Sequence, residues 1–264
     1  MTDDLSAALT ANEHRLGIFA GRVRWYEEVG STNDLVLSWA DAGGEEGLAA
    51  IADAQTSGRG RLGRRWSSPP GAGIYLSVLL RPARSVLPLL TLTAGVVVAE
   101  AIQAASGLAV SLKWPNDVCI EAGTSGWLKI AGILAEAGTT STGGNYAIVG
   151  IGINVRTAMY PPEVAVRATS LEAELGRPVD RSMLVVECLS AFAQRYAQLK
   201  GYGEARILDE WRRRASATLA RTVEFDADAT VQRGVAHGID DEGALLVRTG
   251  DGVRRVVSGE VRWL

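Results

Sequence analysis

The chain has 264 residues, a formal net charge of −3 and 47% hydrophobic residues, enough to bury a substantial core in one large domain or two. The net negative charge argues against nucleic acid as the main partner, so any anion-binding function must be local. Two cysteines and two histidines leave little room for a disulfide framework, a metal cluster or a histidine-based triad. The N-terminus is acidic, and no apolar run reaches the length needed to span a membrane. We therefore expect a reduced, cytoplasmic protein.

The first elements are expected to be a short helix or frayed arm over 1–20, a strand over 23–28, a helix, and a buried strand over 48–54. Ser31, Thr32 and Asn33 predict the start of that helix, because they are typical N-cap residues ahead of an amphipathic stretch, and the glycines at 43–44 end it. Capping alone is a sufficient explanation for Ser31 and Thr32, and the alternative is that they also contact a ligand.

Residues 55–66 are the most distinctive stretch, in which three glycines alternate with four arginines ahead of Trp66. Glycines let backbone N–H groups approach a ligand, and arginines supply fixed, always-charged donors that match phosphates and carboxylates. We therefore expect a loop that is mobile when empty and folds over an anion, with Trp66 offering a face to a base. A solvated basic loop or a nucleic-acid-binding segment is the alternative, and neither common glycine-rich phosphate motif is present.

The middle of the chain predicts a strand over 74–80, a long buried helix over 88–105 and a strand over 109–114. The last strand ends at residues 113–117, Lys-Trp-Pro-Asn-Asp, where the proline forces a turn. Asn116 and Asp117 therefore follow a strand end, where polar side chains are commonly presented to ligands. A plain turn without a ligand is the alternative.

Two further strands over 118–121 and 127–136 are expected to form a hairpin around 122–126, followed by a buried strand over 146–154. Lys129 lies among apolar residues in the second arm, and a buried ammonium is costly unless it is paired. The alternative is a surface lysine on an edge strand. In the strand over 146–154, Gly150 and Gly152 alternate, so one face lacks side chains, as close approach of a ligand requires.

The remainder of the chain predicts a proline-containing connection over 155–180 and two amphipathic helices over 181–200 and 204–217. From residue 221 the pattern changes to short alternating segments separated by Gly/Asp turns. This pattern is typical of a small all-β module, expected to be barrel-like, and places a domain boundary near residue 218.

Five stretches in this order resemble the biotin–protein ligase family, namely residues 30–33, 55–66, 113–117, 129–134 and 150–154. The resemblance covers the chain from about residue 25 to its end. It implies an N-terminal arm at 1–24, an α/β catalytic domain at 25–217 with a mixed sheet like that of class II aminoacyl-tRNA synthetases, and an SH3-like β-barrel at 218–264. Many members begin with a DNA-binding winged helix-turn-helix, for which the residues before the first motif are too few, so we expect a ligase without repressor function.

The same resemblance implies a two-step reaction, in which biotin and ATP give biotinyl-5′-AMP and pyrophosphate, and the biotinyl group then passes to a carrier lysine. Lys129 and Arg61 are the implied catalytic residues, Asp117 the implied Mg²⁺ ligand, and Trp66 the aromatic residue on the adenine side. The implied biotin-binding residues are Ser31, Thr32, Asn33, Gln55, Gly58, Arg59, Gly60, Lys129, Gly132 and Gly152. The implied ATP and adenylate residues are Arg59, Arg61, Arg64, Trp66, Asn116, Lys129 and Asn154.

The implied acceptor is the biotin carboxyl carrier protein or domain of a biotin-dependent carboxylase, with neither DNA nor a membrane as partner and a homodimer as one possible assembly. A lipoate or octanoyl ligase or transferase of related fold is the alternative enzyme, although it would not need the polar set Ser31, Thr32 and Gln55. A biotin-sensing or DNA-binding regulator without catalysis is the alternative from another class. Because all five motifs precede residue 218, loss of the β module is expected to impair transfer more than adenylate formation, unless the module supports the nucleotide pocket.

Overall fold

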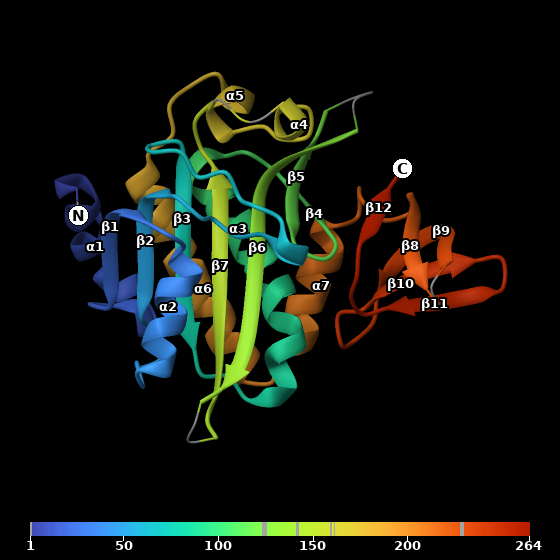
Figure 1. Cartoon of the computed structure of the whole chain (residues 1–264), viewed down its shortest axis with the longest axis horizontal. Helices are drawn as coiled ribbons and strands as arrows, with labels where there is room; N and C mark the ends of the chain where they lie inside the picture. Colours follow the sequence, from blue (N-terminus) through green and yellow to red (C-terminus); the bar gives the residue numbers. More distant parts are fainter. Residues whose placement is uncertain (1, 123–125, 141–142, 159, 161, 228–229) are drawn as a thin grey trace.

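The computed structural model describes residues 2–122, 126–140, 143–158, 160, 162–227 and 230–264. Within them the main feature is a seven-stranded sheet in the order β1-β2-β3-β7-β6-β5-β4, in which β1 and β2 are parallel and the other neighbours antiparallel (Figure 1). The mixed α/β fold is thus confirmed. The strands span Val23–Val29 (β1), Ala49–Gln55 (β2), Gly73–Leu80 (β3), Ser111–Lys113 (β4), Asp117–Glu121 (β5), Trp127–Thr139 (β6) and Asn145–Asn154 (β7).

The strands lie where their apolar and alternating runs predict them, with two qualifications. β4 is shorter than the expected 109–114, because only three residues pair with β5 before the proline turn. The hairpin turn expected at 122–126 includes residues 123–125, which lie outside the described residues.

The two faces of the sheet are covered differently, because successive side chains of a strand point to opposite sides. On one face, Leu76 of β3 and Ile151 of β7 belong to the main core, which also contains side chains of α3, α6 and α7. On the other face, Leu79 and Ile148 pack against α2 (Thr32–Asp41). α2 covers only part of this second face, and the segment that follows β2 crosses another part of it (Figure 1).

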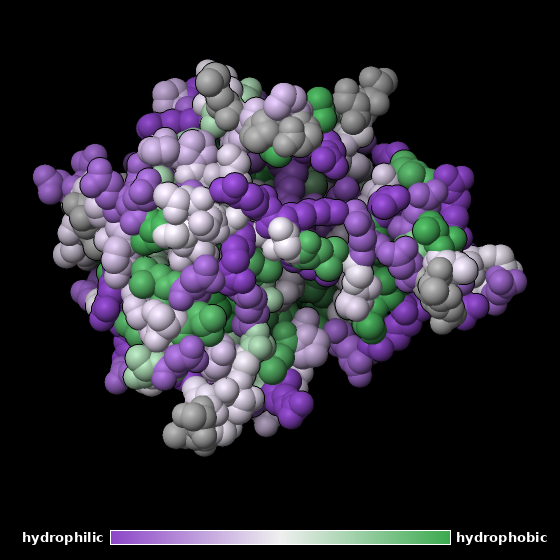
Figure 2. All heavy atoms as spheres, viewed as in Figure 1, coloured by the Kyte–Doolittle hydropathy of each residue, from purple (hydrophilic) through white to green (hydrophobic). Residues whose placement is uncertain are grey.

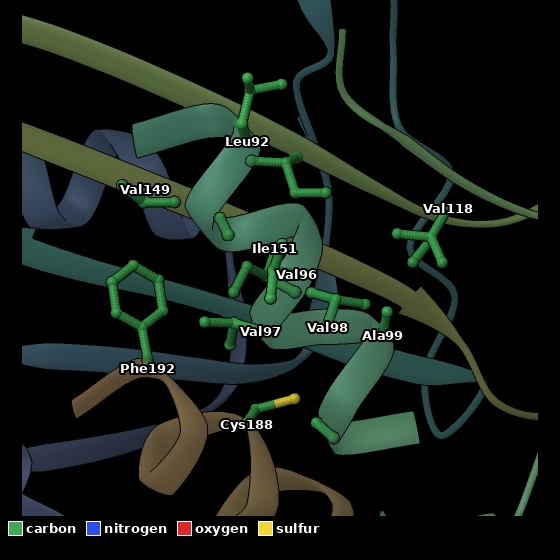
Figure 3. Close-up of a cluster of buried hydrophobic side chains, with 14 of the residues drawn as sticks. Leu92, Val96, Val97, Val98, Ala99, Val118, Val149, Ile151, Cys188 and Phe192 are labelled. Atoms are coloured by element: carbon green, nitrogen blue, oxygen red, sulfur yellow. The ribbon is translucent and has the colours of Figure 1, made fainter. Parts of the chain in front are cut away.

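The helix α3 (Leu90–Ser106) is the centre of the core, preceded by a 3₁₀ turn at Arg84–Leu89. It packs against Cys188 and Phe192 of α6 (Arg181–Lys200) on one side and against the sheet on the other (Figure 3). The segment Arg84–Ser106 is in fact long and apolar enough to cross a membrane, contrary to our expectation from the sequence, but 72% of its most apolar window is buried inside the protein. Its apolar composition is therefore that of a core helix.

Of the two expectations for the N-terminal residues, the structure has the short helix and not the frayed arm. They form α1 (Asp3–Ala11) and two short 3₁₀ turns that lie against α6. Leu16 and Phe19 are 1% and 0% exposed, and Phe19 meets Phe192 edge to face with 5.8 Å between ring centroids. Arg15 Nη2 lies 2.6 Å from Glu187 Oε2. The segment is therefore part of the folded core.

The connection over 155–180 contains two short helices that the sequence analysis did not predict. They are α4 (Pro162–Ala165) and α5 (Leu171–Leu175), which begins at a Ser170 cap. Between them the chain runs beside β6, because Lys129 N donates to Arg167 O and Thr169 N donates to Lys129 O. This connection therefore forms one border of the open part of the second sheet face (Figure 1).

The C-terminal module follows α7 (Glu204–Arg214) and lies beyond the β4 edge of the large sheet (Figure 1). The part that the structure describes is a five-stranded antiparallel sheet in the order β11-β10-β9-β8-β12. Its strands are Thr222–Ala227 (β8), Thr230–Ile239 (β9), Leu245–Thr249 (β10), Gly252–Val256 (β11) and Val261–Trp263 (β12). The module is fastened to the large domain, since Trp114 Nε1 donates to Gly243 O at 3.0 Å and Thr218 Oγ1 donates to Leu112 O at 2.7 Å.

Candidate active site

The open part of the second sheet face has a floor with few side chains. Gly132 of β6 pairs with Gly152 of β7, and the next pair on the same face is Leu134 with Gly150. A Cβ added at Gly132 or Gly152 would lie 2.9 or 2.5 Å from atoms of the Trp66 indole. The bare strip predicted from the alternating glycines is therefore present, and the ring of Trp66 lies directly over it.

A β-bulge in β6 changes which side chains face this strip. Val118 of β5 pairs with Ala131, and the next residue, Cys119, pairs with Lys129, so Ile130 is an extra residue in β6. In a regular strand, residues three apart face opposite sides. The extra residue brings Lys129 to the same side as Gly132.

Lys129 is paired with a carboxylate on this face and is not a free surface lysine. Its Nζ contacts Oδ1 of Asp117, which stands opposite Gly132 at the start of β5. The same Nζ lies 5.2 Å from the centroid of the Trp66 ring, a distance at which a cation is attracted to an aromatic face. The side chain keeps 30% exposure, so the ammonium remains accessible from the cavity.

The Gly/Arg loop closes on itself above this strip. Gly60 N donates to Arg64 O at 2.7 Å, and Trp66 N donates to Gly58 O at 2.9 Å. A 3₁₀ turn at Arg61–Gly63 forms the tip, where Leu62 adopts a φ of 55°. In this closed conformation the hydrogen bonds offset part of the ordering entropy of the loop, and its mobility in the absence of ligand stays a prediction.

The arginines of the loop point to different partners. Arg59 binds Glu136 through both terminal nitrogens, at 2.9 and 2.7 Å, and lies 2.8 Å from Asp34. Arg64 Nη2 lies 2.6 Å from Glu260 of the C-terminal module. The side chain of Arg59, predicted to bind nucleotide, is thus directed to protein carboxylates in this conformation.

Arg61 reaches across the cavity, and its Nη1 donates to Asn116 Oδ1 at 3.4 Å. Burial lowers the pKa of Arg61 while the charge of Asp117 opposes that shift, but an arginine stays protonated at any physiological pH. Asn116 Nδ2 also donates to Ile133 O at 2.8 Å, and Asn154 Nδ2 donates to Thr169 O at 3.0 Å. Both amides are therefore held in place by backbone oxygens.

Short polar side chains gather at the α2 end of the cavity. Ser31 caps α2, with its Oγ accepting from Asp34 N at 3.5 Å, so the capping explanation holds for this residue. Gln55 Oε1 accepts from the backbone N and the Oγ1 of Thr32 at 2.9 and 3.1 Å, and Gln55 Nε2 donates to Ser68 Oγ at 2.8 Å. Ser31, Thr32 and Gln55 also line the cavity, so capping does not exclude contact with a ligand.

One cavity of about 570 Å³ brings the predicted residues together. Figure 2 shows hydrophilic atoms crossing the middle of this face, over a hollow with hydrophobic atoms in its walls. Of the predicted site residues, Gly58 alone falls outside the lining, and it supports the loop from behind, where a Cβ would lie 2.5 Å from Trp66 O. The placement of Trp66 over Gly132 and Gly152 brings it to the predicted biotin-side residues, and its adenine-side role stays a prediction.

Several lining residues were missed by the sequence analysis, among them Tyr160, Arg167, Glu260 and Trp263. Burial raises the pKa of the Tyr160 hydroxyl, and hydrogen bonding from Arg64 lowers the pKa of Glu260. Lys113 Nζ lies 5.9 Å from the ring centroid of Trp263. Tyr160 and Arg167 lie in the connection after β7, and the other two missed residues lie in the C-terminal module. No local signal in either segment of the sequence indicates a site.

Three buried N–H groups among the described residues lack a hydrogen-bond partner, namely Arg59 Nε, Trp66 Nε1 and Trp263 Nε1. All three residues line the same cavity. An unsatisfied buried donor costs about 1–3 kcal/mol, and most buried donors in folded proteins are paired. Three unpaired donors thus belong to residues that line the cavity.

The described residues contain no group of three or more His, Cys, Asp and Glu side chains that could hold a metal ion. Asp117 stands in the cavity as a carboxylate beside Asn116. Mg²⁺ is usually bound by one or two carboxylates together with substrate phosphates, so this donor set fits a Mg²⁺ ion that arrives with a nucleotide.

Comparison with known proteins agrees with this geometry. Residues 25–154 match the family described as "Biotin/lipoate A/B protein ligase family", and residues 221–262 match "Biotin protein ligase C terminal domain". The biotin–[acetyl-CoA-carboxylase] ligase of Paracoccus denitrificans is 36% identical over 241 residues, which cover 88% of this chain and 96% of that protein. A bifunctional ligase/repressor of Bacillus subtilis is 33% identical over 96% of this chain and 78% of its own length.

The fold is also similar to solved structures. The biotin protein ligase of Aquifex aeolicus in complex with biotin and ATP superposes with a TM-score of 0.79 at 31% sequence identity. The match covers 92% of this chain and 98% of the other. The likeness therefore extends over both the large domain and the C-terminal module.

Proposed function

Because the chain belongs to the biotin protein ligase family, we propose that it activates biotin with ATP and transfers the biotinyl group to a lysine of a biotin-dependent carboxylase. One observation carries the proposal. A single cavity holds the polar set Ser31, Thr32 and Gln55 at one end and the Lys129–Asp117 pair with Arg61 at the other. The first group suits a ureido ring with two N–H donors and one carbonyl, and the second suits a carboxylate meeting a phosphate.

In the first step, a carboxylate oxygen of biotin attacks the α-phosphorus of ATP, the bond to the bridging oxygen breaks, and pyrophosphate leaves. Both reactants are anionic, so the protein must neutralise charge and hold the two groups in line. Lys129 can bridge the carboxylate and the α-phosphate, and Arg61 adds a permanent charge from the loop. A Mg²⁺ ion carried by the nucleotide, with Asp117 as a protein ligand, would neutralise the leaving pyrophosphate.

In the second step, the amine of the acceptor lysine attacks the acyl carbon of the adenylate, the acyl–oxygen bond breaks and AMP leaves. The amine loses a proton to form the amide. This step needs an acceptor held in line more than it needs further charge on the protein. We propose that the acceptor is the biotin carboxyl carrier protein or domain, which presents its lysine on an exposed turn.

The alternative is a lipoate or octanoyl ligase of related fold, since the matching family description names both biotin and lipoate. A long apolar acyl chain would leave Ser31, Thr32 and Gln55 without a function in recognition. Biotin-dependent ATP–pyrophosphate exchange, compared with the same assay using lipoate, separates the two. A mass gain of one biotinyl group on a carrier domain incubated with the protein, ATP, Mg²⁺ and biotin tests the complete reaction.

We also propose that the protein works in the cytoplasm. Cys119 and Cys188 are free and buried, and burial raises the pKa of both thiols to about 12, which keeps them protonated and unreactive. Free thiols are typical of a reducing compartment. Fractionation of cells that produce the native protein tests this proposal.

A further inference from the structure

The side chain of Glu136 has three hydrogen bonds from two parts of the biotin site, although no motif in the sequence indicated it. Oε1 accepts from Arg59 Nη1 at 2.9 Å, and Oε2 accepts from Arg59 Nη2 at 2.7 Å and from Asn33 Nδ2 at 2.8 Å. Glu136 stands on β6 beyond Leu134, on the same sheet face as the glycine strip. One carboxylate thus joins the Gly/Arg loop to the first turn of α2.

Asn33 is the buried centre of this arrangement, at 4% exposure. Its second N–H donates to Leu134 O at 3.3 Å, and its Oδ1 accepts from Ser77 Oγ at 2.6 Å. Both N–H groups of the amide are therefore already used within the protein. These contacts fix α2 and the adjacent Thr32 against the sheet, while Asn33 also lines the cavity, so its predicted contact with biotin stays a prediction.

Glu136 lies behind the loop and not in the cavity that holds Lys129. It lines a second cavity of about 580 Å³ on the other side of the Gly/Arg loop, together with Asp34 and residues 57–65, and it does not line the first. The carboxylate is therefore placed to hold the loop from outside and not to touch the ligand.

We propose that Glu136 is a positioning residue for biotin, which holds the first half of the Gly/Arg loop and the start of α2 in the arrangement that binds the ureido ring. This inference rests on the proposed function. An isolated surface ion pair contributes little, but Glu136 forms a bidentate pair and also binds a buried amide, which makes the contact directional. Arg61 and Arg64, in the second half of the loop, lie outside this contact and contact Asn116 and Glu260.

Glu136→Gln tests the proposal, because it keeps the side chain's size and removes its charge and one acceptor oxygen. In ATP–pyrophosphate exchange we expect the KM for biotin to rise about tenfold or more, with the KM for ATP and kcat within about twofold of wild type. Glu27→Gln, which makes the same change on the exposed side of β1, is the matched control and should change nothing. Thermal melting verifies that both variants are folded.

Arg59→Gln removes the contact with Glu136 from the loop side, together with the pair that Arg59 forms with Asp34, without altering the sheet. Because Glu136 acts partly through Arg59 and partly through Asn33, the double variant should raise the KM for biotin by less than the product of the two single effects. Full additivity of the two effects would contradict the proposal. Equal rises in the KM for biotin and for ATP would contradict it as well, since they would indicate general damage to the site.

A second readout does not depend on activity. Trypsin must take the guanidinium of Arg59 into its own pocket, so release of Arg59 from Glu136 should speed cleavage after this residue in ligand-free Glu136→Gln, with cleavage after Arg65 unchanged. If wild-type protein exchanges no pyrophosphate with biotin, the proposed function fails, and the cleavage pattern still tests the contact. Unchanged cleavage after Arg59 overturns the inference, and so does faster cleavage with an unchanged KM for biotin.

Discussion

At the scale of single residues, the environment of Lys129 explains how a lysine can occur in an apolar strand. The bulge at Ile130 turns it toward the cavity, where Asp117 and the face of Trp66 stabilise its charge. The same partners keep the ammonium in a fixed place, which electrostatic stabilisation of a transition state requires.

Lys129→Ala should leave the fold intact and lower the rate of biotin-dependent ATP–pyrophosphate exchange by about 100- to 1,000-fold, the usual effect of removing one preorganised charged donor. Circular dichroism checks the fold. Lys200→Ala on the surface of α6, where the lysine pairs with Glu46, is the control. Exchange at the wild-type rate would mean that Lys129 has only a structural role.

Arg61 is predicted to retain the reactive adenylate, because it lies at the tip of the loop and reaches Asn116 across the cavity. A hydrogen bond to a charged group is worth about 1.5–3 kcal/mol, so Arg61→Gly should speed escape of the adenylate roughly ten- to a hundredfold. The variant should still activate biotin and should label lysines of serum albumin added to the reaction.

Arg65→Gly is the control for this experiment, since Arg65 is exposed and donates to Thr56 O within the loop. It should leave albumin unlabelled. If Arg61→Gly also leaves albumin unlabelled while carrier biotinylation slows, Arg61 acts in activation and not in retention.

At the scale of elements, the N-terminal segment behaves as a part of the core. Phe19 is fully buried against Phe192, and Arg15 pairs with Glu187 on the same helix. Phe19→Ala should lower the free energy of unfolding by about 3–5 kcal/mol, the usual cost of deleting a buried aromatic side chain. Urea denaturation measures the change, with exposed His14→Ala as the control. A loss below about 0.5 kcal/mol, typical of surface substitutions, would indicate an arm that detaches from α6.

At the scale of the whole molecule, the C-terminal module is a wall of the active-site cavity. Gly259, Glu260 and Trp263 line it, and Val223 and Phe225 of β8 belong to the same hydrophobic core as the large domain. The position of all five motifs before residue 218 by itself predicts a selective defect in transfer. The structure favours the alternative that the module supports the nucleotide pocket.

Removal of residues 218–264 should therefore abolish both half-reactions. Trp263→Ala is the milder test, and it should raise the KM for ATP in pyrophosphate exchange, an assay that needs no carrier. If Trp263→Ala exchanges normally and only transfer to the carrier falls, the module serves the acceptor and not the nucleotide.

The contact between Arg64 and Glu260 joins the loop to the module and should depend on pH. Hydrogen bonding and charge from Arg64 lower the pKa of Glu260 below its ordinary value of 4.5. A lowered pKa in the folded state means that the contact adds stability above pH 4.5 and loses it as the pH falls through the folded-state value. The difference in unfolding free energy between wild type and Glu260→Gln should be constant above about pH 6 and shrink toward pH 3. A difference independent of pH would mean that Glu260 is not paired in solution.

The sequence by itself determined the elements and the chemistry that they carry. Apolar periodicity predicted the strands and the buried helix α3, and local composition identified the Gly/Arg loop, the bare glycine strip and the unusual Lys129. These features depend on residues close together in the chain, so their meaning can be judged without the fold.

The tertiary structure decided which of these features meet and what holds them. An extra residue in β6 places Lys129 beside Asp117, and Glu136 holds Arg59 and Asn33 from behind the loop. Glu260 and Trp263, far along the chain, complete the cavity wall. Such contacts depend on strand register and on packing between distant segments. A one-residue shift in register exchanges the two faces of a strand, and the bulge at Ile130 makes such a shift within β6.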